Sequence, residues 1–150
     1  MKVFKSKKSK DKVIETYDKL LDMWGVPFEE KDIETSYGIT HVIECGNKEH
    51  PPLVLFHGVG DNSALMWIYN AKSLSERFHL YAVDTIGGPG KSSPNENYNK
   101  MFDQILWIDE LLDKLGIAKT NIAGVSNGAY ITQYYCIKRA DRILKAACMT

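Results

Sequence analysis

The amino-acid sequence predicts an α/β protein with a mostly parallel sheet and flanking helices. Helical and strand-like hydrophobic patterns alternate along the chain, as they do in right-handed βαβ units. One strand, residues 53–56, is apolar throughout, which is typical of a strand buried on both faces of a parallel sheet. The 150 residues are 44% hydrophobic and 25% charged, close to the average of globular proteins, so one domain with one core is expected.

The first part of the chain predicts a basic tail, a helix and a hairpin. Residues 1–10 are expected to form a solvated tail, because lysines crowd the start of the chain: Lys2, Lys5, Lys7, Lys8, Lys10 and Lys12. Apolar side chains at helical spacing predict an amphipathic helix within residues 11–25, ended by Gly25 and Pro27. Strands are expected over residues 28–35 and 39–45, both partly exposed and joined by the turn residues 36–38.

Residues 28–150 are expected to form the sheet and its crossover helices. Beyond the hairpin, strand patterns occur at residues 53–56, 79–83, 121–123 and 144–149, and helical patterns at residues 64–76, 101–115 and 128–139. The helix 101–115 is expected to bury one apolar stripe, which consists of Met101, Ile105, Ile108, Leu112 and Leu115.

Charge and cysteine content argue against several classes of protein. Lys plus Arg and Asp plus Glu number 19 each, so no net charge favours nucleic acid or an anionic membrane. No apolar run follows the lysines as in a secretory signal, and none is long enough to span a bilayer. Scattered cysteines without metal-ligand spacing indicate free thiols in a reducing compartment. We therefore expect a cytoplasmic protein that holds no metal or cofactor and binds no nucleic acid.

Residues 124–128 carry the first chemical motif, Gly-Val-Ser-Asn-Gly. This G-x-S-x-G follows a strand pattern and precedes a helical one, which is the setting of a serine nucleophile elbow. Gly124 and Gly128 leave room where the strand turns into the helix, and the helix directs backbone N–H groups toward Ser126. Because glycines around a serine also occur in ordinary loops, the motif alone is equally compatible with a structural turn.

A second motif, His57-Gly58-Val59-Gly60, follows the buried strand. Ligands of open α/β sheets bind beyond the carboxyl ends of the strands. The glycines would let the N–H of Val59 point into the same pocket as the N–H of Asn127 and form an oxyanion hole. We interpret His57 as a brace of this loop, with catalytic base as the alternative. The other histidines are interpreted as structural or surface groups: His41, His50 and His79.

A third stretch, residues 84–92, ends in Gly90-Lys91-Ser92, as a phosphate-binding P-loop does. Thr85 stands where that motif needs a glycine, and residues 93–95 continue as a loop instead of opening a helix at the lysine. We therefore expect Asp84 and Ser92 to hold a tight surface loop through hydrogen bonds to the backbone.

The three motifs together resemble those of the α/β-hydrolase superfamily of esterases and lipases. Residues 52–58 are similar to its third strand and oxyanion loop, and residues 124–128 to its nucleophile elbow. Residues 84–92 resemble its D-x-x-G-x-G-x-S loop with one residue more. Residues 24–44 and the pair 66–67 are also similar to bacterial carboxylesterases. The resemblance implies an α/β-hydrolase fold truncated after about the sixth strand, with residues 1–150 as a single incomplete domain.

By this resemblance, Ser126 attacks a small carboxylic ester and forms an acyl-enzyme. Val59 and Asn127 donate the oxyanion hydrogen bonds, and the supporting positions are His57, Gly58, Gly124 and Gly128. The family's triad acid and histidine follow the serine, and neither has its expected place here, so the chain alone is expected to be inactive or weakly active. The alternative is a non-catalytic truncated product or interaction module that retains the elbow.

Two further expectations concern packing. Residues 144–149 would form an exposed sheet edge, through which the chain self-associates or binds a companion chain. Trp67 and Tyr130 lie close to the motifs, and both are expected in the core rather than in a pocket wall.

Overall fold

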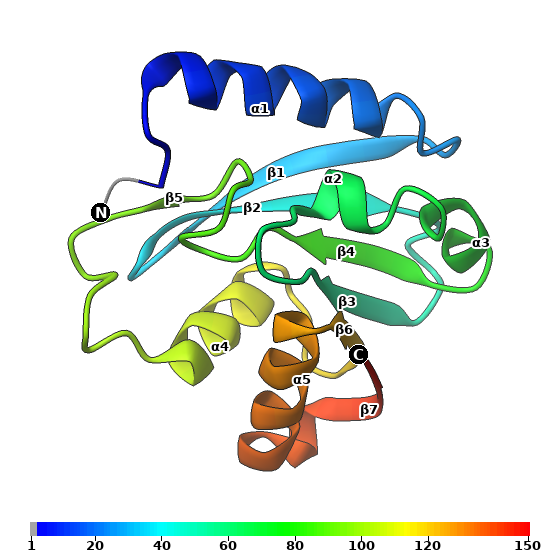
Figure 1. The fold of residues 1–150 in the computed structure, drawn as a ribbon. Coiled ribbons are helices and arrows are strands. Elements are labelled where there is room, and N and C mark those ends of the chain that lie inside the picture. Colours follow the sequence, from blue (N-terminus) through cyan, green and yellow to red (C-terminus); the bar gives the residue numbers. More distant parts are fainter. Residues whose placement is uncertain (1–2) are drawn as a thin grey trace.

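The fold has three layers, in which helices cover both faces of one sheet (Figure 1). The computed structural model describes residues 3–150, so Lys2 of the predicted tail lies outside it. The helices are α1 (Lys7–Leu21), α2 (Ser63–Met66), α3 (Ala71–Ser75), α4 (Gln104–Lys114), α5 (Asn127–Lys138) and the 3-10 helix η1 (Ala140–Arg142). The strands are β1 (Phe28–Thr35), β2 (Gly38–Cys45), β3 (Pro52–Phe56), β4 (His79–Val83), β5 (Ser93–Pro94), β6 (Thr120–Val125) and β7 (Ile143–Met149).

The sheet joins an antiparallel part to a parallel part. Its strand order is β1-β2-β4-β3-β6-β7, and β5 pairs beside β2. β2 runs antiparallel to β1, β4 and β5, whereas β4, β3, β6 and β7 are parallel to one another. The predicted α/β class is confirmed, and β3 is central and parallel as expected. The carboxyl ends of β3, β4 and β6 therefore meet at one edge of the sheet.

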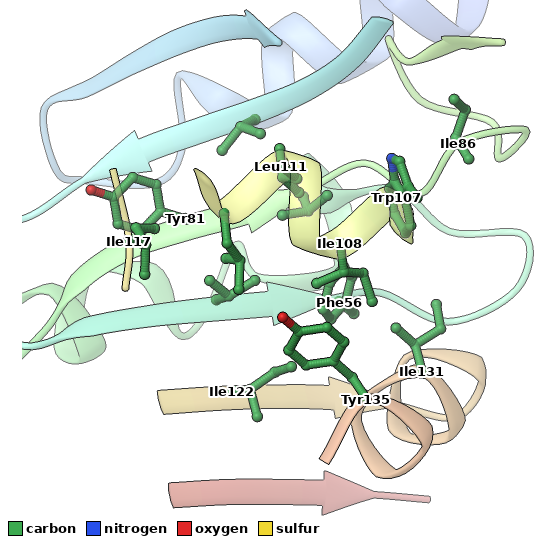
Figure 2. Packing of buried hydrophobic residues seen from close by; sticks show 14 of the residues in the cluster. Phe56, Tyr81, Ile86, Trp107, Ile108, Leu111, Ile117, Ile122, Ile131 and Tyr135 are labelled. Carbon is green, nitrogen blue, oxygen red and sulfur yellow. The ribbon is translucent and has the colours of Figure 1, made fainter. Parts of the chain in front are cut away.

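Alternate side chains of β3 enter two separate hydrophobic clusters. Leu53 and Leu55 pack on the side covered by α1, α2 and α3, whereas Val54 and Phe56 pack on the side covered by α4 and α5. Figure 2 shows the second cluster, with Phe56 between Ile108 of α4 and Tyr135 of α5. This two-sided burial is why the strand is apolar at every position.

The boundary between tail and first helix differs from the prediction. α1 begins at Lys7, so residues 7–10, which were assigned to the tail, are helical. Ser6 is the N-cap, and its side-chain oxygen accepts a hydrogen bond from the N–H of Ser9 at 3.1 Å. The helix ends at Leu21, but Trp24 beyond it stays buried, and its Nε1 donates to the Ala64 carbonyl at 2.9 Å.

The prediction that β2 is partly exposed is wrong. The strand pairs on both sides, and nearly all of it is buried. Its polar side chains are correspondingly paired: His41 contacts Asp32 at 2.7 Å, and Glu44 contacts His79 at 2.7 Å. Burial opposes ionisation of Glu44, but the hydrogen bonds from Lys31 and His79 outweigh it and lower the pKa of this carboxyl.

Residues 64–76 form two short helices instead of the single predicted one. The chain leaves helical geometry at Trp67 (φ −103°, ψ 6°), and this turn brings both Trp67 and Ile68 into the core. The spacing of hydrophobic residues in the sequence cannot reveal this break, because the residues of the turn are themselves hydrophobic and buried. The core position predicted for Trp67 is confirmed.

The start of α4 was also predicted too early. Asp103 caps this helix by accepting hydrogen bonds from the N–H groups of Ile105 and Leu106. Met101 therefore precedes the helix and is 84% exposed, outside the stripe to which it was assigned. Strand β5 was not predicted at all, because a two-residue strand that contains Pro94 shows no period.

A buried hydrogen bond between α4 and β2 gives a test of this packing. Nε1 of Trp107 donates to Oγ1 of Thr40 at 2.8 Å. We expect Trp107→Phe and Thr40→Val each to lower the free energy of unfolding by about 1–3 kcal/mol, since each leaves one buried polar group without a partner. The double variant should lose clearly less than the sum, as measured by urea unfolding. Fully additive losses would show that this bond does not join the helix to the sheet.

Candidate functional site

Ser126 lies at the sharp turn from β6 into α5. It is the N-cap of α5 and has φ 53° and ψ −113°, the only positive φ of a non-glycine residue in residues 3–150. Such a backbone costs on the order of 1–3 kcal/mol and persists only where the surroundings impose it. The residue is exposed, its N–H donates to the Met149 carbonyl at 2.8 Å, and its side chain makes no capping bond. The hydroxyl is therefore presented to solvent by a strained turn.

The two glycines of the elbow are required by close backbone contacts. A Cβ at Gly124 would overlap the carbonyl of Gly128, and a Cβ at Gly128 would overlap the carbonyl of Phe56 in β3. The first turn of α5 thus lies directly against the ends of β6 and β3. This contact is what makes the turn at Ser126 so tight.

The loop after β3 lies next to Ser126, as the oxyanion prediction requires. A Cβ built on Gly58 would be 3.5 Å from the Cβ of Ser126. Val59 and Asn127 line the same cavity, of about 230 Å³, at the carboxyl ends of the strands. Within residues 3–150, neither backbone N–H has a hydrogen-bond acceptor. Unpaired N–H groups beside an exposed serine hydroxyl are the components of an oxyanion hole.

His57 is a buried brace in this structure. Its Nδ1 donates to the Gly58 carbonyl at 2.8 Å, and its Nε2 accepts from the N–H of Thr85 at 2.9 Å. Both ring nitrogens of the neutral side chain are thus occupied by backbone groups. The brace interpretation agrees with these bonds, and the ring holds the loops after β3 and β4 together.

Asp84 fixes the second of these loops from the inside. One carboxylate oxygen accepts from the N–H of Ser63 at 2.8 Å, and the other from the N–H of Lys91 at 2.7 Å. Oγ of Ser92 donates to the Asp84 carbonyl at 2.7 Å. The hydrogen bonds agree with the prediction, but the loop is not a surface loop at these positions, because Asp84 and Ser92 are both buried.

Two residues near the site differ from expectation. Tyr130 is 59% exposed, so its predicted core position is wrong; it lies on the outer face of α5 and stacks on Tyr134 with ring centroids 6.0 Å apart. Thr85 was considered only as a mismatch to a P-loop, yet it binds His57. This contact follows from the parallel pairing of Phe56 with Val83, because the pairing places the residues after β3, including His57, beside those after β4, including Thr85.

The remaining histidines are engaged away from Ser126. His79 contacts Glu44, and His41 contacts Asp32 and Glu30, within the sheet. His50 precedes β3, at the opposite edge of the sheet from the site. In residues 3–150, no histidine makes a hydrogen bond to the Ser126 hydroxyl. The described residues thus bring together a serine and two N–H donors, without the base that would activate the serine.

The described residues form neither a metal site nor a membrane-spanning helix. Across residues 3–150, no group of His, Cys, Asp or Glu side chains is arranged to hold a metal ion. None of the helices in the same range combines the length and the apolar character needed to cross a membrane.

The fold and the site together define a class of protein: an α/β sheet protein with a serine at a strand-turn-helix elbow beside unpaired N–H groups. Residues 51–150 match the family described as the alpha/beta hydrolase fold. The chain therefore belongs to the α/β-hydrolase fold family.

Similar proteins include two carboxylesterases of Bacillus subtilis (strain 168). One, Nap, is 35% identical over 136 residues, which are 91% of this chain and 45% of Nap. The other, YbfK, is 33% identical over 132 residues, which are 88% of this chain and 44% of YbfK. The crystal structure of naproxen esterase from B. subtilis matches with a TM-score of 0.88 and 34% identity over 94% of this chain and 49% of that one. The chain thus spans about half the length of these relatives.

The contact between Gly128 and Phe56 can be tested by one added methyl group. Gly→Ala inside a helix usually stabilises it by about 0.5–1 kcal/mol. We expect Gly128→Ala to do the opposite and to lower the free energy of unfolding by about 1–3 kcal/mol, because its Cβ would overlap the Phe56 carbonyl. Asn127→Ala is the matched control in the same turn and should change stability little. Denaturant unfolding measures both; a stabilised Gly128→Ala would contradict the close approach.

Proposed function

We propose that Ser126 is the nucleophile of a hydrolase that acts on carboxylic esters through an acyl-enzyme. The observation that carries the proposal is the strained, exposed Ser126 next to the free N–H groups of Val59 and Asn127. In the proposed reaction the Ser126 oxygen bonds to the ester carbonyl carbon, the alcohol leaves with a proton, and water then releases the acid. The carboxylesterase relatives support the choice of ester as substrate class.

Val59 and Asn127 would stabilise the negative oxygen that forms during this attack. Their N–H groups are fixed by loops that His57 and Asp84 tie together, so they need no rearrangement when charge develops. A base for Ser126 is not among the described residues. The proposal therefore assigns the chain a positioned nucleophile and oxyanion hole, with slow chemistry when it acts alone.

The proposal includes a cytoplasmic location. Cys45, Cys136 and Cys148 are all free, and Cys148 is also exposed, which suits a compartment that keeps thiols reduced.

Acylation by an activated ester tests the nucleophile. We expect p-nitrophenyl acetate to acetylate Ser126 on the order of a thousandfold faster than it acetylates a free serine amide, the residual effect of an oxyanion hole without a triad. Intact-protein mass spectrometry and peptide mapping give the rate and the position. Ser126→Ala should remove the modification at this site. Equal labelling of many serines and lysines, with no preference for Ser126, would contradict the proposal.

Two variants of Val59 separate the oxyanion donor from the side chain. Val59→Pro removes the N–H and should slow acylation of Ser126 about a hundredfold. Val59→Ala keeps the N–H and should react as the unmodified chain does, since the side chain is 80% exposed. Equal rates for the two variants would show that this N–H does not contact the substrate.

A second candidate function, a non-catalytic interaction module, is favoured by β7. Among residues 3–150 this strand pairs only with β6, and its residues beyond Ile143 are all exposed, including Leu144 and Met149. An exposed, largely apolar edge strand is a template for pairing with another strand. We propose that β7 pairs with a second copy of the chain or with a companion chain.

Sedimentation under reducing conditions tests this pairing. We expect the chain to self-associate, and Leu144→Lys to weaken association at least tenfold because a charged side chain blocks an edge. Ile137→Lys is the matched control, since Ile137 is 76% exposed on α5 and lies outside β7. A monomer at all concentrations, or equal effects of both variants, would rule out pairing between copies through β7.

A further inference from the structure

A second cavity, of about 470 Å³, lies between α1 and the loops that carry the candidate site. One face of α1 forms one wall, with Lys12, Val13, Thr16 and Leu20; Gly60, Asn62, Leu65 and Pro89 form the other. We call this space the α1 groove. Its volume is within the range of small-molecule sites, about 300–1,000 Å³. Neither the family match nor the proposed nucleophile accounts for it.

The α1 groove exists because only one half of α1 is packed tightly. Tyr17 and Leu21 are buried, the ring of Tyr17 lies edge-on to His41 at 6.0 Å, and Nζ of Lys91 lies 4.7 Å from the centre of the same ring. Toward the start of the helix, Val13 is only half-buried. Figure 1 shows α1 extending past α2 toward the N-terminus. The side chains of α1 that line the groove run from Ser9 to Leu20.

The α1 groove adjoins the cavity that Val59 and Asn127 line beside Ser126. Gly60 and Pro89 line both spaces. Nδ2 of Asn62 donates to the Pro89 carbonyl at 3.4 Å and joins the two loops beneath this boundary. A Cβ at Gly60 would meet no atom within 4 Å, so the space beside this residue is open. A ligand can thus extend from the oxyanion loop along α1.

Charge indicates what kind of ligand fits. Lys12 is the one charged side chain in the lining, and it has no ion pair in residues 3–150, whereas Glu15 on the same helix pairs with Lys19. Lys8 lies one helical turn before Lys12 and does not line the α1 groove. An apolar channel with a free cation at its end matches an apolar chain that ends in an anion.

We propose that the α1 groove binds the chain of an anionic amphiphile: an ester whose apolar chain lies along α1 with a carboxylate near Lys12. This inference rests on the proposed function for the position of the ester group at Ser126. Binding of the chain itself needs no nucleophile, so the two claims can be separated.

Binding is measured by calorimetry on the Ser126→Ala chain, with decanoate below the concentration at which it forms micelles. We expect Val13→Trp and Leu65→Trp, which both fill the α1 groove, to weaken decanoate binding at least tenfold. Met23→Trp is the matched control: Met23 is exposed and does not line the α1 groove. Shortening the chain by one methylene should weaken binding about fourfold for each group that leaves the groove. Circular dichroism confirms that each variant is folded.

Charge reversal tests the position of the anion. Lys12→Glu should weaken decanoate several-fold and should favour decyltrimethylammonium instead, whereas Lys8→Glu should do neither. The proposal would be overturned if the Trp variants bound decanoate as tightly as the chain with an open groove. It would also be overturned if decyltrimethylammonium bound the unmodified groove as tightly as decanoate does. Binding only to anionic vesicles would also overturn it and would point to a lipid surface. Loss of Ser126 acylation with decanoate binding intact would refute the proposed function alone.

Discussion

The candidate site depends on one contact between two backbones, that of Gly128 in α5 with Phe56 in β3. Because no side chain separates them, the helix starts directly on the ends of β6 and β3. The chain must then turn at Ser126 with a positive φ, and the first N–H of α5 comes next to the loop after β3. The close contact of Gly128 with Phe56 therefore fixes three things: where the Ser126 hydroxyl lies, the strain in its backbone, and where the N–H donors lie.

Polar side chains then hold the loops around this point. His57 binds the loop after β4 through Thr85, and Asp84 of that loop binds the start of α2 through Ser63. His57, Asp84 and Ser63 are buried, so water competes little for their hydrogen bonds. These hydrogen bonds hold the two loops in place beside Ser126, as the proposed oxyanion hole requires.

The sequence predicted the elements whose signals are local. Strands β1 and β4 have the predicted bounds, and the elbow and the brace follow from glycine spacing and from position beyond a strand. Exposure was harder to predict: β2 is buried because α1 and α4 cover it, and Tyr130 is exposed because its face of α5 points away from both clusters. The α1 groove left no sequence signal, since it depends on how far a helix stands from two distant loops.

The strand order also determines the order in which the strands can pair and bury the core. β1 and β2 meet through a short turn, so their hairpin can form in about 1–10 μs. β3 must wait for β6, whose Thr120 donates to the Pro52 carbonyl across a long stretch of chain. At about 5–20 residues per second on a ribosome, that wait lasts seconds. For that time Val54 and Phe56 lack the partners from β6 and α5 that cover them in the folded chain, so the nascent β3 exposes apolar surface.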